Sequence, residues 1–185
     1  MSVEKPLAGL KVADFSMVYA GPICARMLSD CGASVTKIEP LGAGDTVRGN
    51  GRIFAHFNAG KSSVQIDLSI TEGQELAHRL IDEADVVIEN YRPGVMQRFG
   101  LDYASVKGRR PDLVYCSISG FGQSGPAAQR AAYAPVAHAA SGYDIAHMRA
   151  QIHDDTQVGE NDRPPASGIM IADMLTGAYA FGAIQ

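Results

Sequence analysis

Short apolar segments recur along the first two thirds of the chain, and each is followed by a turn or by a segment with helical periodicity. Runs of roughly four to eight residues that are rich in β-branched and aromatic side chains are typical of β-strands. Five such runs predict strands at residues 10–15, 34–38, 64–68, 86–89 and 113–118. The fourth, Val86 to Glu89, is almost continuously apolar, which indicates a strand that is covered on both faces.

Helical patterns separate these predicted strands. Pro22 opens a helix that ends at Gly32, because proline favours the first turn and glycine the position after the last turn. Residues 71–84 place apolar side chains on one face, and shorter helices are predicted up to Phe99 and over residues 133–141. Residues 149–165 are expected to form a polar surface segment. The alternation predicts an α/β fold, a Rossmann-like parallel sheet with helices on both faces.

Glycine-rich and polar loops follow the predicted strands at residues 16–21, 39–51, 90–94 and 119–125. The loop over residues 39–51 is too long to be a simple turn, and long ordered loops usually carry function. Open parallel sheets bind ligands outside the carboxyl ends of their strands. We therefore expect the functional residues to lie in these loops.

Asp173 is the only acidic residue in the apolar segment over residues 167–185. Ser167 can cap a helix that begins near Ile169, and the composition of that helix leaves it no wide polar face. Asp173 is therefore expected to be partly buried, where a carboxylate must be paired, hydrogen-bonded or protonated. Judged by residue type alone, a structural role is the more common one for such an aspartate. The helical pattern reaches Gln185 without a C-cap glycine or a basic last turn, so further chain or a partner is expected to complete it.

Composition limits the classes of protein that fit. Hydrophobic residues make up 46% of the chain and charged residues 19%, which excludes disordered and fibrous proteins. The net charge of −4 argues against a nucleic-acid or acidic-membrane partner. The N-terminus lacks an apolar signal core, which predicts a cytoplasmic protein without a membrane partner. Cys24, Cys31 and Cys116 form no C-x-x-C pair and are expected to be reduced.

Several familiar motifs are incomplete. Gly42 and Gly44 lack the third glycine and the following helix of a dinucleotide fingerprint, and residues 60–62 end like a P-loop but lack its first glycine. Residues 153–155 offer His-Asp-Asp without a partner cluster, so no metal site is predicted. His138 lies in an alanine-rich helix, where a satisfied core histidine is more common than a catalyst, although its closeness to Tyr133 keeps it a candidate.

Five groups of residues recur in the order and spacing of one known family. They are Asp14-Phe15-Ser16 with Ala20-Gly21-Pro22, residues 32–39 with Gly44-Asp45, Asn58 with Lys61-Ser62, residues 89–96 with Phe99-Gly100-Leu101, and residues 115–122 with Gly125-Pro126. Together they cover nearly the whole chain and resemble the family III CoA-transferases, also called the CaiB/BaiF family. This resemblance implies that Asp173, in the sequence Ile-Ala-Asp-Met-Leu-Thr-Gly, is the catalytic nucleophile, and it reverses the preference for a structural aspartate.

The resemblance also implies a binding site for coenzyme A, here a substrate in the form of acyl-CoA. The implied CoA contacts are Val18, Tyr19, Leu68, Asn90, Tyr91 and Arg98. Arg92 lies at a strand end, where a guanidinium group suits a phosphorylated ligand, and joins this set. In the substrate pocket the resemblance implies Tyr133, and His138 is placed beside it as a candidate.

Three departures from the family pattern bear on specificity. Tyr19 stands where formyl-CoA transferases have glutamine, and Ala134 stands where an acid is common. Pro40 occupies the position of a CoA-contacting arginine in some members. Tyr133 replaces the histidine that the racemase branch needs. Family members are also longer and form interlocked homodimers, so a second domain and a returning segment are expected beyond Gln185, supplied by the same chain, a homodimer or a second chain.

The resemblance predicts CoA transfer from an acyl-CoA to a carboxylic acid through an acyl-aspartyl anhydride at Asp173. Two alternatives remain open at this stage. One is an acyl-CoA racemase or epimerase with Asp173 and His138 as its bases. The other is a non-catalytic CoA-binding subunit, or a fragment that needs the missing half.

Overall fold

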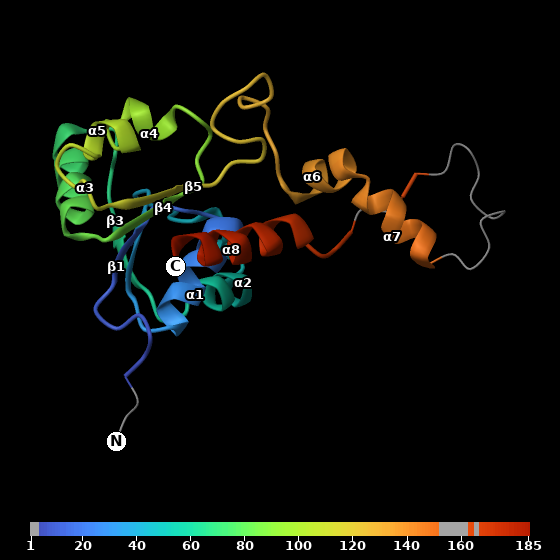
Figure 1. The fold of residues 1–185 in the computed structure, drawn as a ribbon, viewed down its shortest axis with the longest axis horizontal. Helices are drawn as coiled ribbons and strands as arrows, with labels where there is room; N and C mark the ends of the chain where they lie inside the picture. Colours follow the sequence, from blue (N-terminus) through green and yellow to red (C-terminus); the bar gives the residue numbers. More distant parts are fainter. Residues whose placement is uncertain (1–3, 152–162, 165–166) are drawn as a thin grey trace.

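The computed structural model describes residues 4–151, 163–164 and 167–185. Its centre is a sheet of five parallel strands in the order β3-β2-β1-β4-β5 (Figure 1). The strands are β1 (Lys11–Asp14), β2 (Ser34–Glu39), β3 (Ser62–Gln65), β4 (Val86–Glu89) and β5 (Val114–Ser117). This architecture confirms the predicted α/β fold with a parallel sheet.

The strand order reverses direction between β1 and β4. The chain runs outward from β1 through β2 to β3, and then crosses to the other side of β1 to form β4 and β5. Ala13 pairs with Thr36 of β2 on one side and with Val87 of β4 on the other. In such sheets the loops on either side of the reversal separate and leave a crevice at the carboxyl ends of the strands.

Helices cover both faces of the sheet, because successive residues of the buried strands point to opposite sides. Ala13 and Val87 pack in a core with α3 (Thr71–Glu83), α4 (Val95–Arg98) and α5 (Tyr103–Val106). Val12 and Ile88 face the second core, which contains Leu28 of α1 (Ala20–Asp30). Figure 1 shows these two layers on either side of the strands.

Helix α8 (Ile171–Ile184) lies against α1 and carries Asp173 in its first turn. Gly177 marks the closest approach, because a Cβ atom there would lie 2.7 Å from the carbonyl oxygen of Ala20 and 2.8 Å from the Cβ of Ile23. The other side of α8 is apolar and exposed, with Leu175 51% and Tyr179 77% accessible. The prediction of a helix without a wide polar face is thus confirmed, although the helix begins two residues later than expected.

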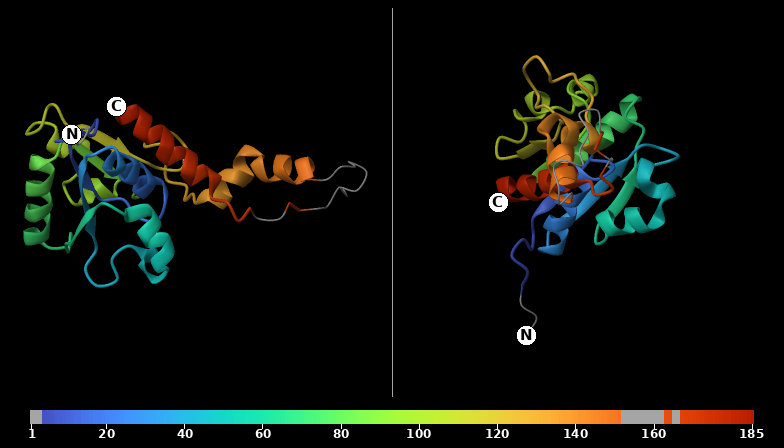
Figure 2. Two further views of the ribbon diagram at one scale, coloured as in Figure 1. Left: turned by 90° about the horizontal axis from the view of Figure 1, so that it is seen from below. Right: turned by 90° about the vertical axis from the view of Figure 1, so that its right-hand side faces the viewer.

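Helices α6 (Ala134–Ser141) and α7 (Tyr143–Gln151) project from the sheet, as Figure 1 and the left view of Figure 2 show. The prediction of a helix over residues 133–141 is confirmed. The prediction of a polar surface segment from residue 149 is wrong at its start, since residues 149–151 complete α7. Residues 152–162 and 165–166, including the His-Asp-Asp sequence, lie outside the described residues.

Two other predictions needed correction. The expected strand over residues 64–68 is found at Ser62–Gln65, because its pairing with β2 begins at Ser62. The predicted loop over residues 39–51 contains a 3-10 turn, η1 (Thr46–Gly49), and a helix that was not predicted, α2 (Gly51–Asn58), begins at its last residue. Asn50 caps α2 by accepting a hydrogen bond from the amide of Ile53, so a residue typical of loops starts a helix here. No helix among the described residues is long and apolar enough to cross a membrane.

Candidate active site

A cleft of about 320 Å³ opens at the carboxyl ends of β1, β4 and β5, at the reversal of the strand order. Its walls are formed by Met17, Val18 and Ala20, residues 90–93, residues 118–120, several residues between 128 and 137 and the first turns of α8. Six of the predicted site residues line it: Val18, Asn90, Tyr91, Arg92, Tyr133 and Asp173. The structure therefore brings together residues from nearly opposite ends of the chain, from Val18 to Asp173.

Asp173 lies in the first turn of α8 and is partly buried. Burial raises the pKa of this carboxyl group above its ordinary value, and the influence of His138 opposes that rise. Among the described residues that line the cleft, Asp173 supplies the only carboxylate, and no histidine, cysteine or lysine lines it. Asp173 is therefore the candidate nucleophile among the described residues of the cleft.

The turn after β1 has an unusual backbone conformation. Val18 has a φ of 70°, and among the described residues it is the only one other than glycine with a positive φ. This conformation is costly for a β-branched residue and persists only where the surroundings impose it. Such backbone strain is concentrated at functional sites, and Val18 lines the cleft.

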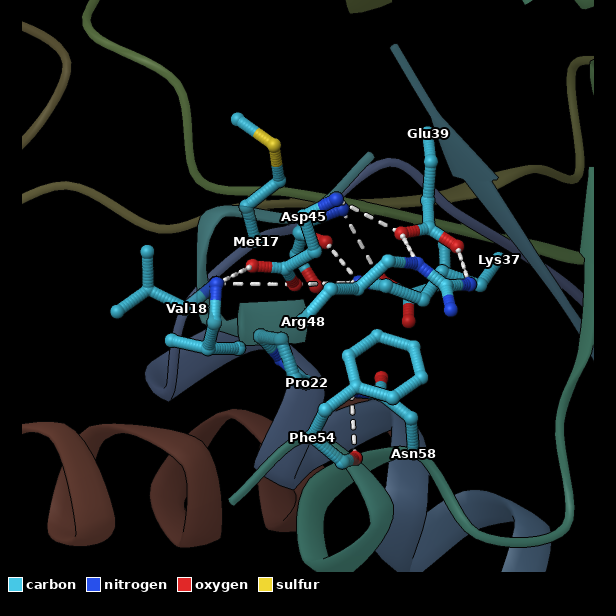
Figure 3. Close-up of polar contacts among 12 residues, drawn as sticks. Met17, Val18, Pro22, Lys37, Glu39, Asp45, Arg48, Phe54 and Asn58 are labelled. Atoms are coloured by element: carbon cyan, nitrogen blue, oxygen red, sulfur yellow. Dashed lines mark hydrogen bonds and ion pairs between the residues drawn. The ribbon is translucent and has the colours of Figure 1, made fainter. Parts of the chain in front are cut away.

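Two side chains, those of Asp45 and Asn90, hold the Val18 turn through its backbone. The amide of Val18 donates to both carboxylate oxygens of Asp45, at 3.1 and 3.2 Å (Figure 3). Asn90 accepts from the amide of Met17 at 2.8 Å and donates to the carbonyl of Met17 at 2.7 Å. The side-chain amide of Asn90 is thus engaged by the protein, and this residue shapes the cleft wall as well as lining it.

Buried ion pairs support the same turn. Lys37 Nζ lies 2.9 Å from Asp45 and donates to the carbonyl of Ser16 at 2.7 Å, and both charged side chains are almost fully buried. Lys61 Nζ lies 2.9 Å from Asp14, again with both side chains buried. Burial alone would raise the pKa of Asp14, but the ammonium groups of Lys61 and Lys37 bring it below its ordinary value. Buried charges that are paired and hydrogen-bonded in this way hold a fixed geometry, whereas an unpaired one would be very costly.

Glu39 extends this network outward. Its carboxylate accepts from Arg48 Nε at 2.8 Å, from Ser63 Oγ at 2.6 Å and from the amide of Asp45 at 2.8 Å. Burial opposes its ionisation, yet these hydrogen bonds lower the pKa of Glu39 to about 2. Arg48 in turn lies over the ring of Phe54, as Figure 3 shows. The family motifs contain Asp14, Lys37, Glu39, Asp45 and Lys61 but neither Arg48 nor Ser63, and the network that these residues form was not predicted.

Four of the predicted site residues lie outside the cleft lining. Tyr19 packs edge-on against Phe57, with ring centroids 5.1 Å apart. Leu68 packs against the core under α3, and Arg98 is exposed at the end of α4. His138 is 2% exposed and lies behind the cleft wall, where it contacts the backbone of α8. The roles predicted for these four residues remain predictions.

No group of three or more potential metal ligands occurs within residues 4–151, 163–164 and 167–185. The described part of the cleft offers two cationic side chains, Arg92 and Arg130, and one anionic one, Asp173. The arrangement suits an anionic or phosphorylated ligand that presents an electrophilic carbon to Asp173.

Comparisons with known proteins find similar chains among the CoA-transferases. The chain is 38% identical over 193 residues to succinyl-CoA:glutarate CoA-transferase from Homo sapiens. This match covers 100% of the chain and 42% of the relative. It is 38% identical to succinate–glutarate CoA-transferase from Agrobacterium fabrum over 98% of this chain and 46% of the relative. A crystal structure of a CaiB/BaiF family protein from Brucella suis matches with a TM-score of 0.84 and 39% identity, covering 98% of this chain and 48% of that one.

The chain thus spans less than half the length of these relatives. The match to the family covers residues 7–185, which includes every strand of the sheet, the Val18 turn and Asp173. The protein belongs to CoA-transferase family III.

Proposed function

We propose that this protein transfers CoA from an acyl-CoA thioester to a carboxylic acid, with Asp173 as the nucleophile. The observation that supports this most is the position of Asp173, a partly buried carboxylate in the cleft at the strand reversal. Burial removes water that would stabilise the charge, so the carboxylate is a stronger nucleophile than a solvated one. The family to which the chain belongs supports the same chemistry.

The proposed reaction begins when Asp173 attacks the thioester carbonyl. The carbon–sulfur bond breaks, which leaves an acyl-aspartyl anhydride and a CoA thiolate. The thiolate attacks the Asp173 carbonyl and releases the donor acid as a carboxylate. The acceptor carboxylate then displaces the thiolate to form a second anhydride, and the thiolate attacks the acceptor carbonyl. The new thioester leaves, and Asp173 regains its carboxylate.

The apolar cleft wall serves this chemistry because an anhydride must be kept from water. Met17, Ile118 and a series of alanines contribute to that wall. We place CoA along the strand ends, with Val18, Tyr19, Leu68, Asn90 and Tyr91 as its neighbours and Arg92 and Arg98 near its phosphates. Arginine is well suited to phosphate because its planar guanidinium group can donate two hydrogen bonds in parallel.

We propose dicarboxylic acids as the substrate class. The relatives are named for succinyl-CoA, succinate and glutarate, all of which carry a second carboxylate. Arg92 and Arg130 line the cleft and are cations that could meet that second group. Tyr133 lines the same wall, where it would contact the acyl group.

The racemase alternative lacks support from the geometry. Racemisation needs a second base across the substrate from Asp173. His138, the candidate for that role, is buried behind the cleft, and its Nε2 atom accepts a hydrogen bond from the backbone of α8. We therefore favour transfer.

We propose that residues 1–185 act as the CoA-binding domain that carries the nucleophile, in the cytoplasm, as part of a larger assembly. A second domain and a returning segment, from the same chain, a homodimer or a second chain, would complete it. Two observations support this: the relatives are more than twice as long, and α8 exposes Leu175 and Tyr179 on its free side. A large exposed apolar surface of this kind usually marks an interface.

One experiment separates these functions. The protein is isolated from its source with every polypeptide that co-purifies, and succinyl-CoA and glutarate are mixed with it in deuterated water. Transfer predicts glutaryl-CoA and free succinate, without exchange of an α-proton of the acyl group. Deuterium incorporation without a new thioester would support the racemase, and neither reaction with any pair of acids would contradict the proposal.

A further inference from the structure

His138 lies under the first turn of α8 and contacts it directly. Its Nε2 atom accepts a hydrogen bond from the backbone amide of Ala172 at 3.2 Å, and its side chain is 2% exposed. A ring nitrogen that accepts a hydrogen bond carries no proton. The neutral ring must therefore carry its proton on Nδ1.

Nδ1 faces the carboxylate of Asp144. The distance from Nδ1 to Asp144 Oδ1 is 3.8 Å, which is longer than a hydrogen bond, and neither atom has another partner among the described residues. Asp144 comes from the first turn of α7, and the ring of Tyr143 lies 4.8 Å from the His138 ring, centroid to centroid. A buried donor and a buried acceptor that face each other are complementary, and leaving both unpaired would be costly.

This contact matters because α8 has no cap of its own. The residue before the helix is Met170, whose side chain accepts no hydrogen bond from the first amides, and the Ser167 hydroxyl bonds to Ile169 among the described residues. The first four amides of a helix have no partner inside it. His138 accepts from one of these amides, that of the residue directly before Asp173.

We propose that His138 is a positioning residue for Asp173, and that Asp144 selects the His138 tautomer that makes this possible. This inference rests on the proposed function, in which Asp173 is the nucleophile. With the proton on Nδ1, the ring accepts from the first turn of α8 and fixes the Asp173 backbone. With the proton on Nε2, two donors would face each other and the turn would lose its anchor.

The arrangement resembles a carboxylate that orients a histidine at a catalytic site, but here the histidine holds a backbone amide. Loss of the hydrogen bond from the Ala172 amide to His138 would displace Asp173, the proposed nucleophile. Because reaction rates depend steeply on the position of the attacking atom, a shift of the turn by about 1 Å is expected to slow the attack by about 100-fold. Binding of CoA, which uses the opposite wall of the cleft, is expected to change little.

The test compares three variants of the protein as isolated from its source. His138→Phe keeps the ring and removes the acceptor, and His138→Gln keeps an acceptor near the Nε2 position. His147→Phe is the matched control, because His147 also stacks on Tyr143 but contacts no residue of α8 among its described hydrogen bonds. We expect kcat to fall about 10- to 100-fold in His138→Phe, with KM for the acyl-CoA within about 3-fold, and to stay within about 3-fold of the wild type in the other two.

Equal losses in His138→Phe and His138→Gln, or no loss in either, would overturn the proposal. If His138→Phe fails to fold, Asp144→Ala takes its place. In that variant, nitrogen-15 NMR of the histidines should show that His138 loses its preference for the Nδ1 proton, and the Ala172 amide should exchange with solvent about 10-fold faster. A wild-type His138 with its proton on Nε2 would also overturn the proposal.

These NMR and exchange measurements need no turnover. If Asp173→Asn retained CoA transfer, the proposed function would fail while the His138 tautomer and the Ala172 protection stayed as predicted. The two failures are therefore distinguishable.

Discussion

The two sides of the cleft are built in different ways. The Val18 turn is held by buried charges, with Asp45, Lys37 and Asn90 bonding to its backbone from the loop after β2, from β2 and from the end of β4. Asp173, on the other side, lies on α8, which packs against α1 at Gly177 and donates a hydrogen bond from the Ala172 amide to His138 of α6. Buried polar contacts thus fix the Val18 turn, whereas α8 is held by few such contacts and exposes an apolar face.

This difference suggests that the two sides of the cleft have different roles. A turn that binds a large, shared substrate such as CoA benefits from being preformed, because less ordering is then lost on binding. A helix that carries the proposed nucleophile and exposes Tyr179 can be completed by further protein. The opposite pKa shifts agree with the contrast, since the pKa of Glu39 is lowered to about 2 and the pKa of Asp173 is raised.

The largest expected effect comes from the nucleophile. Asp173→Asn and Asp173→Ala should each lower kcat for CoA transfer by about 1,000-fold or more, because both remove the attacking oxygen. CoA should still bind within a few fold, as measured by calorimetry, since the Val18 side is unchanged. Asp112→Asn, an exposed carboxylate in the loop before β5, is the control and should be neutral. Near-normal turnover in Asp173→Asn would remove Asp173 from the mechanism.

The next effect lies on the Val18 side. Asp45→Ala should lower the free energy of unfolding by about 3–5 kcal/mol, because it leaves the buried ammonium group of Lys37 without its partner. It should also weaken CoA binding, since the strained Val18 amide loses its acceptor. Chemical denaturation and calorimetry measure the two effects. Asp30→Ala, which removes the exposed i,i+4 partner of Arg26, should cost less than about 1 kcal/mol. Equal costs for the two variants would show that burial of the Lys37–Asp45 pair is unimportant.

Helix α8 contains its own matched pair of glycines. Gly177→Ala should destabilise the protein by about 1–3 kcal/mol, because the new Cβ would contact the Ala20 carbonyl and Ile23 too closely. Gly182→Ala has no atom within 4 Å of the new Cβ and should be neutral or slightly stabilising. Thermal unfolding compares the two variants. The reverse order would mean that α8 does not pack on α1 through Gly177.

The smallest effect is a pH dependence of opposite sign on the two sides. Glu39 has a lowered pKa, so it stabilises the fold above pH 4.5, and this contribution is lost as the pH falls toward 2. The difference in free energy of unfolding between the wild type and Glu39→Gln should therefore decrease in acid. The expected decrease is about 1–2 kcal/mol, because Arg48 is partly exposed and solvent screens its interaction with Glu39.

Asp173 has a raised pKa, so its ionisation opposes folding at neutral pH. Asp173→Asn should thus be more stable than the wild type at neutral pH, and the difference should close as the pH falls toward 3.8, the ordinary pKa of the group. Denaturation curves at several pH values measure both trends. Parallel trends in the two variants would contradict the contrast between the two sides.

Several of these features could be predicted from the sequence. The alternating apolar segments predicted the parallel sheet. The lone acid of an apolar helix, Asp173, was predicted to be partly buried, and the family resemblance made it the candidate nucleophile. Lys37 was not predicted as a buried charge, because it sits in an alternating strand pattern and its partner Asp45 lies eight positions on, in a loop. Helix α2 was missed for a similar reason, since its cap Asn50 and the glycines around it are typical of a turn.

His138 was predicted to be a pocket residue because it is close to Tyr133 in the chain. Its contact with Ala172, 34 positions away, depends on how α6 meets α8, which local patterns do not encode. Tertiary contacts of this kind decide which polar residues line a binding site and which residues instead position those that line it.

The central claim, covalent participation of Asp173, can be tested by following oxygen. In the proposed reaction the acceptor carboxylate leaves one of its oxygens on Asp173, because the thiolate finally attacks the acceptor carbonyl. The protein is turned over with an acceptor acid labelled with heavy oxygen, digested, and analysed by mass spectrometry. Heavy oxygen in the Asp173 side chain, and no label in the Asp112 control position, is the predicted result. CoA transfer that proceeds while Asp173 stays unlabelled would contradict the account.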